Sequence, residues 1–450
     1  MGLFKLGFVG LILGGLAYLY IQSNKVVPVP KLGDVWWGKG DPSKEDKGIK
    51  PFKIDVSESV INDLRYRLEH APPFEPPLEG VGQNYGINTK LLEKIVAHWK
   101  TKYDWSERQK FLNQFPQYTT SIQGLKIHYI HVKPKAVQGA RVVPLLLLHG
   151  WPGSVREFYE IIPLLTTPQK GRKVVFEIIA PSLPGYGFSE GTSKPGLGTP
   201  EMAVIFKNLM KRLGFQKYYI QGGDWGALIV QHMAIQFPDQ VLAVHSNMCS
   251  NNKMVSNFKI WVLGSLFPSF LTTEQERELF YPPSQKIFTN VILLEMGYFH
   301  IQATKPDTVG VGLRDSPVGL AAYIIEKFIT WTDSTWKNLE DGGLTKKFTY
   351  DQLLDNVMIY WVSRSATTSM RLYAQFFSKS TLEFDEAPVT IPAACARFRN
   401  EIVLTPESVL RDKYLNLTQV TLHPDGGHFA AFEVPALLAK DVYDFVETLI

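Results

Sequence analysis

The sequence contains very little cysteine: only Cys249 and Cys395 occur among its 450 residues. Two cysteines are too few for the disulfide framework of a small secreted domain, and too few for a zinc site built from thiolates. None of the ten histidines belongs to a His-Glu-x-x-His pattern, a common signature of zinc hydrolases. We therefore expect no metal and no other cofactor.

A strong charge of either sign is also missing. Lys and Arg number 47 against 43 Asp and Glu, so the formal net charge is only +4, and the basic residues form no dense stripe. A nucleic-acid partner is therefore not expected. A chain of this length with 45% hydrophobic residues can instead bury a large core, in one big domain or in several smaller ones.

One long apolar run is present, at residues 6–21. As a helix it spans about 24 Å, and the residues just before it extend it toward the roughly 30 Å core of a bilayer. A cleaved signal peptide is the alternative, but no small-x-small motif follows, so we expect an uncleaved single-pass anchor over residues 1–24. Lys25 and Lys31 outweigh Lys5 before the run, which predicts a cytosolic body, and the scarcity of cysteine agrees.

Two segments separate this run from the main body. Residues 25–50 are rich in proline and glycine, which indicates a stalk. Its adjacent Trp36 and Trp37 either dock at the membrane interface or pack on the protein's own surface. Residues 51–130 carry helical patterns interrupted by prolines, and we expect this N-terminal region to pack on the body and on a cap.

From residue 131 the pattern becomes that of an α/β protein. Solid apolar runs at 142–148, 174–180 and 217–221 predict strands, and helical patterns follow or separate them. Continuous apolar strands alternating with helices are typical of a parallel sheet that is covered on both faces.

The alternation is interrupted once. Residues 131–248 form the first part of the predicted core, and residues 249–372 are aromatic-rich and helical, as an inserted cap would be. Residues 373–450 then resume the alternation and complete the core. We place the cap after the sixth strand.

The central motif is Gly-Gly-Asp-Trp-Gly at residues 222–226, between the third apolar run and a helix. It has the form of a nucleophile elbow, a tight strand-to-helix turn that holds its middle residue in a strained conformation. Here the middle residue is Asp224 instead of serine. A plain glycine-rich turn is the alternative on the pentapeptide alone.

Two similar patterns lack the required context. Ser189 lies at the centre of a Gly-x-Ser-x-Gly sequence at 187–191, but no helix pattern follows, so a serine esterase is not indicated. A dinucleotide-binding fingerprint starting at Gly185 fails because Glu190 stands where glycine is needed.

Three features favour Asp224 as a nucleophile. A His-Gly-Trp-Pro sequence at 149–152 ends an upstream strand, where a loop can supply the N–H of Trp151 to an oxyanion hole together with the N–H of Trp225. His428 follows a late strand, where a general base can face the elbow. Glu401 follows the strand before, giving the order nucleophile, acid, base.

The acid is the less secure member of this set, because Asp385 and Glu386 lie close by in the sequence. Both precede the predicted strand, which favours Glu401.

With these motifs the chain resembles the microsomal epoxide hydrolases, and within that family the juvenile hormone epoxide hydrolases of insects. The resemblance covers nearly the whole chain, including the motifs at 149–154, 222–226 and 426–433. It implies an α/β-hydrolase fold, an anchor in the endoplasmic reticulum membrane, and hydrolysis of an epoxide by water without a cofactor.

The resemblance also implies roles for single residues. Asp224 would be the nucleophile, His428 the base and Glu401 the acid that orients it. Tyr298, within the predicted cap, and Tyr373, at the position directly after it, would protonate the epoxide oxygen. A lipophilic epoxide is the expected partner, either juvenile hormone or a broader range of xenobiotics.

Two other functions remain open on the sequence. A haloalkane dehalogenase also uses an elbow aspartate followed by tryptophan, but typically has asparagine where Trp151 stands. A catalytically inactive carrier of lipophilic ligands is the other alternative, and the complete set of candidate catalytic residues argues against it.

Overall fold

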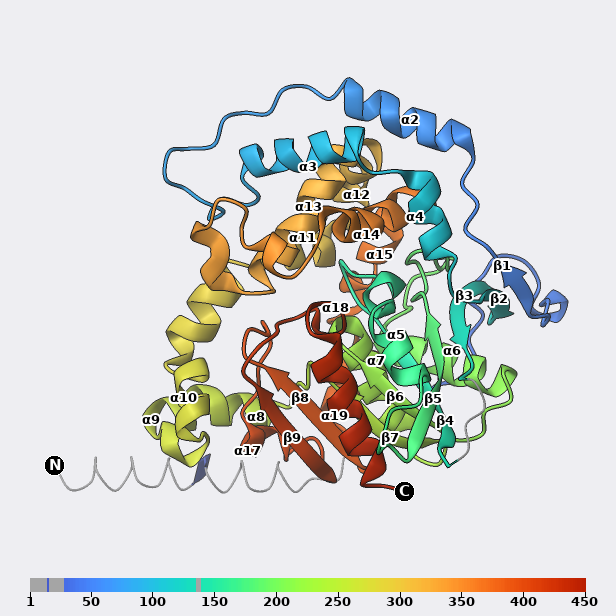
Figure 1. Cartoon of the computed structure of the whole chain (residues 1–450). Coiled ribbons are helices and arrows are strands. Elements are labelled where there is room, and N and C mark those ends of the chain that lie inside the picture. The colour runs from blue at the N-terminus through green and yellow to red at the C-terminus, as the bar shows by residue number, and fades with distance from the viewer. Residues whose placement is uncertain (1–13, 16–27, 135–138) are drawn as a thin grey trace.

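The computed structural model describes residues 14–15, 28–134 and 139–450. In this part of the chain a nine-stranded sheet forms the centre, in the order β1-β2-β3-β5-β4-β6-β7-β8-β9 (Figure 1). The strands are β1 (Lys50–Phe52), β2 (Gln117–Ile122), β3 (Leu125–Val132), β4 (Arg141–Leu148), β5 (Val174–Pro181), β6 (Tyr218–Gly222), β7 (Val241–Ser246), β8 (Ala393–Phe398) and β9 (Leu417–His423).

The sheet is largely parallel, as the apolar runs predicted. Strands β4 to β9 pair in parallel, whereas β1, β2 and β3 pair antiparallel with one another and β3 with β5. The parallel strands are buried because helices pack on the sheet. These helices are α5 (Ile161–Thr166), α6 (Thr199–Arg212), α7 (Asp224–Gln236), α18 (Ala430–Glu433) and α19 (Pro435–Glu447), with the short α17 (Glu407–Leu410) between β8 and β9.

The cap is inserted between β7 and β8 and so follows the seventh strand, whereas the sequence predicted that it follows the sixth. That count was wrong because β1 adds a strand near the start of the described chain. A three-residue edge strand containing Pro51 has no detectable alternation, so the sequence pattern did not reveal it.

The inserted segment is almost entirely helical. Its α-helices are α8 (Met254–Phe258), α9 (Gly264–Leu266), α10 (Glu274–Phe280), α11 (Gly297–Thr304), α12 (Pro306–Asp315), α13 (Pro317–Thr330), α14 (Tyr350–Ser363), α15 (Ala366–Met370) and α16 (Lys379–Glu386). Wider π-helical turns form η3 (Lys259–Leu263) and η5 (Ser284–Leu293). Short 3-10 turns form η4 (Pro268–Phe270), η6 (Ser334–Asn338), η7 (Leu344–Lys346) and η8 (Tyr373–Gln375).

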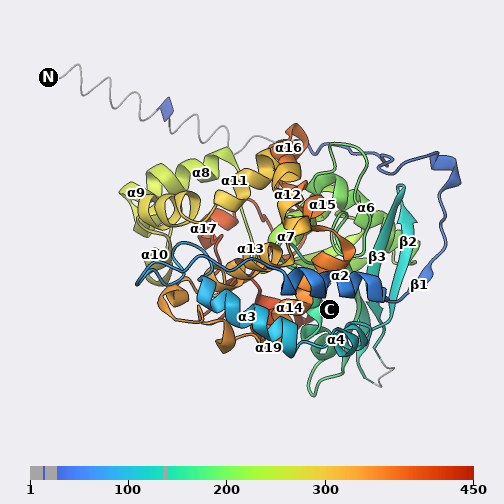
Figure 2. The ribbon, with the colours of Figure 1, turned by 90° about the horizontal axis from the view of Figure 1, so that it is seen from above.

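The N-terminal region lies across the cap. Its helices are α2 (Glu58–Glu69), α3 (Thr89–Thr101) and α4 (Trp105–Leu112). In Figure 2, α2 and α3 pass over the cap helices, and they contact α13 and α14 respectively. The apolar stripe of α3 supplies buried side chains to this contact, among them Ile95 and Trp99.

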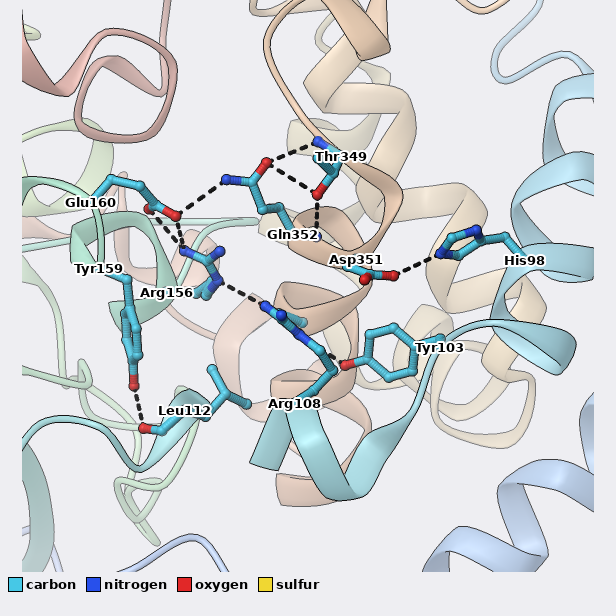
Figure 3. Close-up of polar contacts among 11 residues, drawn as sticks. His98, Tyr103, Arg108, Leu112, Arg156, Tyr159, Glu160, Thr349, Asp351 and Gln352 are labelled. Carbon is cyan, nitrogen blue, oxygen red and sulfur yellow. Dashed lines mark hydrogen bonds and ion pairs between the residues drawn. The ribbon is translucent and has the colours of Figure 1, made fainter. Parts of the chain in front are cut away.

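A buried polar cluster joins the N-terminal region, the core and the cap (Figure 3). At its centre is Asp355 of α14, which is fully buried. Arg156, in the 3-10 turn η2 (Val155–Phe158), donates from Nε to Asp355 over 3.0 Å, and Arg108 of α4 donates from Nε over 2.8 Å. The hydroxyl of Tyr103 donates to the same carboxylate over 3.0 Å, and Glu160 pairs with Arg156. The two arginines are thus matched by two carboxylates.

The stalk is folded onto the body. Trp37 is buried, and its backbone N–H donates to the backbone carbonyl oxygen of Gln123 over 2.9 Å. Trp36 packs on Gly124, where a Cβ would lie 2.6 Å from the indole. Of the two alternatives for this tryptophan pair, packing on the protein's own surface is the one that the structure shows. The segment also contains the 3-10 turn η1 (Pro42–Lys44).

Cys249, just after β7, and Cys395, on β8, are joined by a disulfide that is buried in the core. No local sequence pattern predicts this bond, because 146 positions separate the two residues and only the pairing of β7 with β8 brings them together.

The predicted anchor over residues 1–24 lies outside the described residues, apart from Gly14 and Gly15. Among the residues that the structure describes, no helix has both the length and the apolar character needed to cross a membrane.

Candidate active site

The motif at 222–226 forms a sharp turn between β6 and α7, and Asp224 has a φ of 51° there. This left-handed conformation is rare for a residue with a side chain and indicates a strained position. Glycines on both sides make the turn possible. A Cβ on Gly226 would lie 2.1 Å from the carbonyl oxygen of Leu148, and one on Gly222 would lie 2.5 Å from Gly226. The elbow that the sequence predicted is therefore present.

The loop after β4 approaches the Asp224 side chain closely. The N–H of Trp151 donates to Oδ1 of Asp224 over 2.7 Å, and a Cβ on Gly150 would lie 2.0 Å from the same oxygen. Trp225 is in the first turn of α7, where backbone N–H groups have no partner within the helix. Both amides that the sequence assigned to an oxyanion hole thus lie at the elbow.

His428 lies between two carboxylates. Its Nε2 is 3.1 Å from Oδ2 of Asp224, and its Nδ1 is 2.7 Å from Oε1 of Glu401. The alternative acids face elsewhere: Glu386 accepts a hydrogen bond from the N–H of Met254. The geometry therefore pairs His428 with Glu401, the acid that the sequence favoured over Asp385 and Glu386.

The electrostatics of His428 follow from these neighbours. Burial by itself lowers the pKa of the imidazole, but the carboxylates of Glu401 and Asp224 more than offset it and hold the pKa well above its ordinary value. The imidazolium therefore donates to both carboxylates in the resting site.

Tyr298, at the start of α11, and Tyr373, in η8, reach the elbow from the cap. The Tyr298 ring stacks on the Trp151 ring, with the two ring centroids 5.2 Å apart. The Tyr373 ring packs edge-on against the Trp225 ring, with a centroid separation of 4.7 Å. The hydroxyl of Tyr373 is buried and has no hydrogen-bond partner among the described residues. Burial, together with the charge of Asp224, raises the pKa of Tyr298 well above its ordinary value; burial and the neighbouring tyrosine do the same for Tyr373. Both side chains are neutral proton donors at physiological pH.

Above Asp224 lies a cavity of about 160 Å³. Asp224, Trp225 and both tyrosines line it, together with apolar side chains from the cap and the core: Leu228, Met248, Val291, Met296, Phe299, Phe376, Ile402 and Val403. Such a lining suits a lipophilic ligand whose reacting polar group points at the aspartate.

Several residues that sequence reasoning missed hold this site in place. Asn356 of α14 donates from its side chain to the carbonyl oxygen of Pro152 over 2.7 Å, and the Tyr360 hydroxyl donates to that of Gly153 over 2.7 Å. The cap thereby fixes the Trp151 loop. Glu433 accepts hydrogen bonds from the N–H groups on both sides of His428, each over 2.8 Å, and so fixes the loop that carries His428. Glu433 belongs to the motif at 426–433, and this membership is the sequence feature that could have indicated its role.

Glu157 is a further missed residue. It lines a void of about 10 Å³ that Asp224 and His428 also line, and burial raises its pKa to about 8. A void of this size is close to what one water molecule requires.

The serine pattern at 187–191 has a structural role. The Ser189 hydroxyl donates to the carbonyl oxygen of Ser182 and accepts from the N–H of His128. It lies in the loop between β5 and α6, as the missing helix pattern indicated.

The sheet, the elbow after β6, and the acid and histidine on loops after later strands define an α/β-hydrolase. Residues 143–388 match the family described as "alpha/beta hydrolase fold", and residues 49–158 match "Epoxide hydrolase N terminus". The chain belongs to the epoxide hydrolase family, and it is an enzyme of that class.

Its relatives are similar over their full length. Juvenile hormone epoxide hydrolase 1 of Ctenocephalides felis is 51% identical over 97% of this chain and 94% of its own. Epoxide hydrolase 1 of Oryctolagus cuniculus is 45% identical over 97% of both chains. The crystal structure of juvenile hormone epoxide hydrolase from Bombyx mori superposes with a TM-score of 0.90 at 50% identity, covering 92% of this chain and 98% of that one. These relatives do not favour a haloalkane dehalogenase or an inactive carrier.

Proposed function

We propose that this enzyme converts lipophilic epoxides into vicinal diols through an ester on Asp224, with juvenile hormone as its main substrate. The observation that carries the proposal is the position of Asp224, held by the Trp151 N–H and His428 beneath an apolar cavity that two cap tyrosines enter. The flea and silkworm relatives are named for juvenile hormone, which supports the choice of substrate.

In the first step a carboxylate oxygen of Asp224 attacks a ring carbon, and the carbon–oxygen bond of the epoxide breaks. Tyr298 or Tyr373 gives its proton to the leaving oxygen, so the product is a hydroxyl-bearing ester and not an alkoxide. Their raised pKa values keep both phenols protonated until the substrate arrives.

Formation of the ester removes the negative charge of Asp224. Because that charge helps to raise the pKa of His428, the imidazolium becomes more acidic and releases its proton, which restores the tyrosine. Neutral His428, oriented by Glu401, then takes a proton from a water molecule that attacks the ester carbonyl. The N–H groups of Trp151 and Trp225 stabilise the oxyanion that forms. When it collapses, the bond between the ester carbonyl carbon and the diol oxygen breaks, and that oxygen takes the second proton of the attacking water. Asp224 is again a carboxylate, and His428 keeps the first proton as an imidazolium.

Trapping the ester tests this assignment. In His428→Gln the first step should proceed and the second should stop, so intact-mass spectrometry should find one substrate molecule bound through Asp224. Asp224→Ala should form neither adduct nor diol. A covalent adduct of one substrate molecule on Asp224→Ala, or substantial diol formation by this variant, would place the nucleophile elsewhere.

The substrate is tested by comparing kcat/KM for juvenile hormone with that for a simple aryl epoxide. A large preference for the hormone is expected of a hormone-clearing enzyme. Comparable values would indicate general epoxide detoxification.

We also propose a single-pass anchor over residues 1–24 in the endoplasmic reticulum membrane. The apolar run at 6–21 supports it. The full chain should resist carbonate extraction from microsomes, whereas a chain lacking residues 1–24 should be extracted. Equal extraction of both would reject the anchor.

The lysines after the apolar run favour a cytosolic body, whereas the Cys249–Cys395 disulfide is of a kind more common in oxidising compartments. Asn416 is exposed and begins an Asn-Leu-Thr sequon, so its glycosylation distinguishes a cytosolic body from a lumenal one. A cytosolic body predicts no mass shift on endoglycosidase treatment of the microsomal protein. A shift would place the body in the lumen.

A further inference from the structure

In the helical run at the start of the cap, most of the large apolar side chains face outward instead of toward the protein core. In α8, η3 and α9, the residues that face the protein are Ser256, Ile260 and Gly264, spaced four apart. Two of these three are small, and Gly264 packs so closely that a Cβ would lie 1.8 Å from the Tyr281 hydroxyl oxygen. The face toward the core of a globular protein normally carries the large apolar residues.

The opposite face carries them instead. Met254 is 70% exposed and Leu266 is 67% exposed, and in the following turn η4 Phe270 is 75% exposed. With the exposed side chains of Phe258, Trp261, Val262 and Phe267, they form an outward stripe that we term the apolar ridge: Met254, Phe258, Trp261, Val262, Leu266, Phe267 and Phe270. A contiguous exposed apolar surface of this kind marks a binding site.

The charges around the ridge suit a lipid surface. Residues 253–270 contain no Asp or Glu, and their only charged residues are Lys253 and Lys259. Lys259 pairs with Asp412, and Lys253 points to the same turn. An amphipathic helix with aromatic and aliphatic side chains on one face, and lysines as its only charges, is typical of a segment that lies in the interface of a bilayer.

The position of the ridge in the fold agrees. In Figure 2 the described chain from residue 28 onward starts near α16, at one edge of the molecule. The N–H of Met254 donates to Glu386 of α16 over 2.9 Å, so α8 and α16 are in contact. The 27 residues before this segment include the apolar run at 6–21, so the chain that follows the proposed anchor starts near α16, the helix that contacts α8.

Residues next to the ridge along the chain also line the substrate cavity. The cavity above Asp224 is lined by three residues immediately before α8: Met248, Ser250 and Asn252. Two residues later in the cap, Val291 and Met296, line it as well. An epoxide dissolved in a bilayer would therefore meet the cavity lining next to the segment that touches the lipid.

We infer that the apolar ridge is a second membrane contact, seated in the headgroup and upper acyl region of a phospholipid bilayer, and that lipophilic epoxides enter the active-site cavity from the bilayer beside it. The inference rests on the proposed anchor only for bringing the body to the membrane. Because the ridge inserts side chains without spanning, its contact is reversible and orients the enzyme.

Fluorescence quenching of the full chain in phosphatidylcholine vesicles tests the contact. The two native cysteines are bonded to each other, so Leu266→Cys introduces the one free thiol for an environment-sensitive fluorophore. Tyr66→Cys is the matched control, since Tyr66 is similarly exposed on α2, at the opposite end of the molecule from α9 (Figure 1). Nitroxide groups on the lipid chains should quench the fluorophore at 266 strongly and the one at 66 weakly.

Three outcomes would overturn the inference in different ways. Equally weak quenching at both positions, in a chain that sediments with vesicles, would leave the anchor intact and remove the ridge from the membrane. A fluorophore at 266 that is shielded from aqueous iodide but not reached by the lipid nitroxides would mean that protein, such as a second copy, covers the ridge. A full chain that does not sediment with vesicles would reject both the anchor and the ridge contact.

Kinetics test the route of entry. The triple variant Phe258→Ser, Leu266→Ser, Phe270→Ser changes only exposed positions and should hydrolyse a water-soluble epoxide as the wild type does, which shows that the active site is intact. With a lipophilic epoxide supplied in the vesicles, its KM should rise by roughly threefold or more relative to Tyr66→Ser, because the enzyme engages the bilayer less. An unchanged KM for the bilayer-dissolved substrate would overturn the entry route.

Discussion

Glu401 lies 2.7 Å from Nδ1 of His428, on the side of the imidazole opposite Asp224. The carboxylate keeps a proton on Nδ1, so Nε2 is the nitrogen that faces the elbow. It also contributes to the high pKa of His428. Its removal should therefore change both the rate and the pH dependence of turnover.

For Glu401→Gln we expect hydrolysis of the ester to slow on the order of 10²–10⁴-fold, by analogy with the orienting acid of a serine protease triad. The sign of the pH effect follows from the charge. Loss of the Glu401 carboxylate lowers the pKa of His428, and hydrolysis needs the neutral imidazole, so the acidic limb of the kcat profile should move to lower pH. Glu386→Gln is the control and should behave as the wild type. An acidic limb that stays in place would mean that Glu401 does not set the protonation of His428.

The two tyrosines are predicted to act in the first step. Tyr298→Phe with Tyr373→Phe should slow alkylation on the order of 10²–10⁴-fold, because the leaving oxygen then lacks a proton donor. Rapid-quench measurement of ester formation isolates this step from hydrolysis. Tyr323→Phe is a matched control, since Tyr323 also packs against Trp151 but does not line the cavity. An unchanged burst rate in the double variant would remove both tyrosines from the mechanism.

Asp355 should be essential for stability. Asp355→Ala leaves Arg108 and Arg156 without their shared buried carboxylate, and breaking a buried ion pair on one side costs about 3–5 kcal/mol of unfolding free energy. Denaturant titration followed by fluorescence measures this change. Asp307→Ala, which breaks an exposed pair with Arg371, should cost about 1 kcal/mol or less. Similar losses in the two variants would contradict the central role of Asp355.

The disulfide should contribute to stability by restricting the unfolded chain. It closes a loop of 146 residues, for which the chain-entropy relation gives about 5 kcal/mol at most. Cys249→Ser with Cys395→Ser should lower the melting temperature, and a reductant should do the same to the wild type but not to the variant. Thiol titration of the denatured, unreduced protein should find no free thiol, and finding two would show that the bond does not form.

Much of the core could be predicted from local pattern. The apolar run at 142–148 corresponds to β4 at 141–148, and the run at 174–180 to β5 at 174–181. These strands are buried on both faces, which leaves a continuous signal that a single sequence shows. The short β1 and the boundaries of the inserted helices lack such a signal.

The site divides in the same way. Asp224 could be identified because an elbow needs glycines at fixed spacing between a strand and a helix, and this need is local. Tyr298 and Tyr373 could be found only by resemblance, because nothing in the sequence around a tyrosine says that its hydroxyl is buried near Asp224. Glu157, Asn356 and Glu433 were missed because their roles arise from contacts with loops far away in the chain or from burial.

By itself, the sequence determined the parallel sheet, the elbow at Asp224 and the chain order of Asp224, Glu401 and His428, which we propose as nucleophile, acid and base, since each depends on spacing along the chain. Tertiary structure alone decided that Cys249 bonds Cys395 and that the outward face of α8 and α9 is the apolar one, and it brought Glu401, the acid that the sequence favoured, next to His428. Pairing and exposure are properties of surfaces that meet after folding. They depend on which segments the sheet places side by side, and the spacing of residues along the sequence does not specify which segments become neighbours.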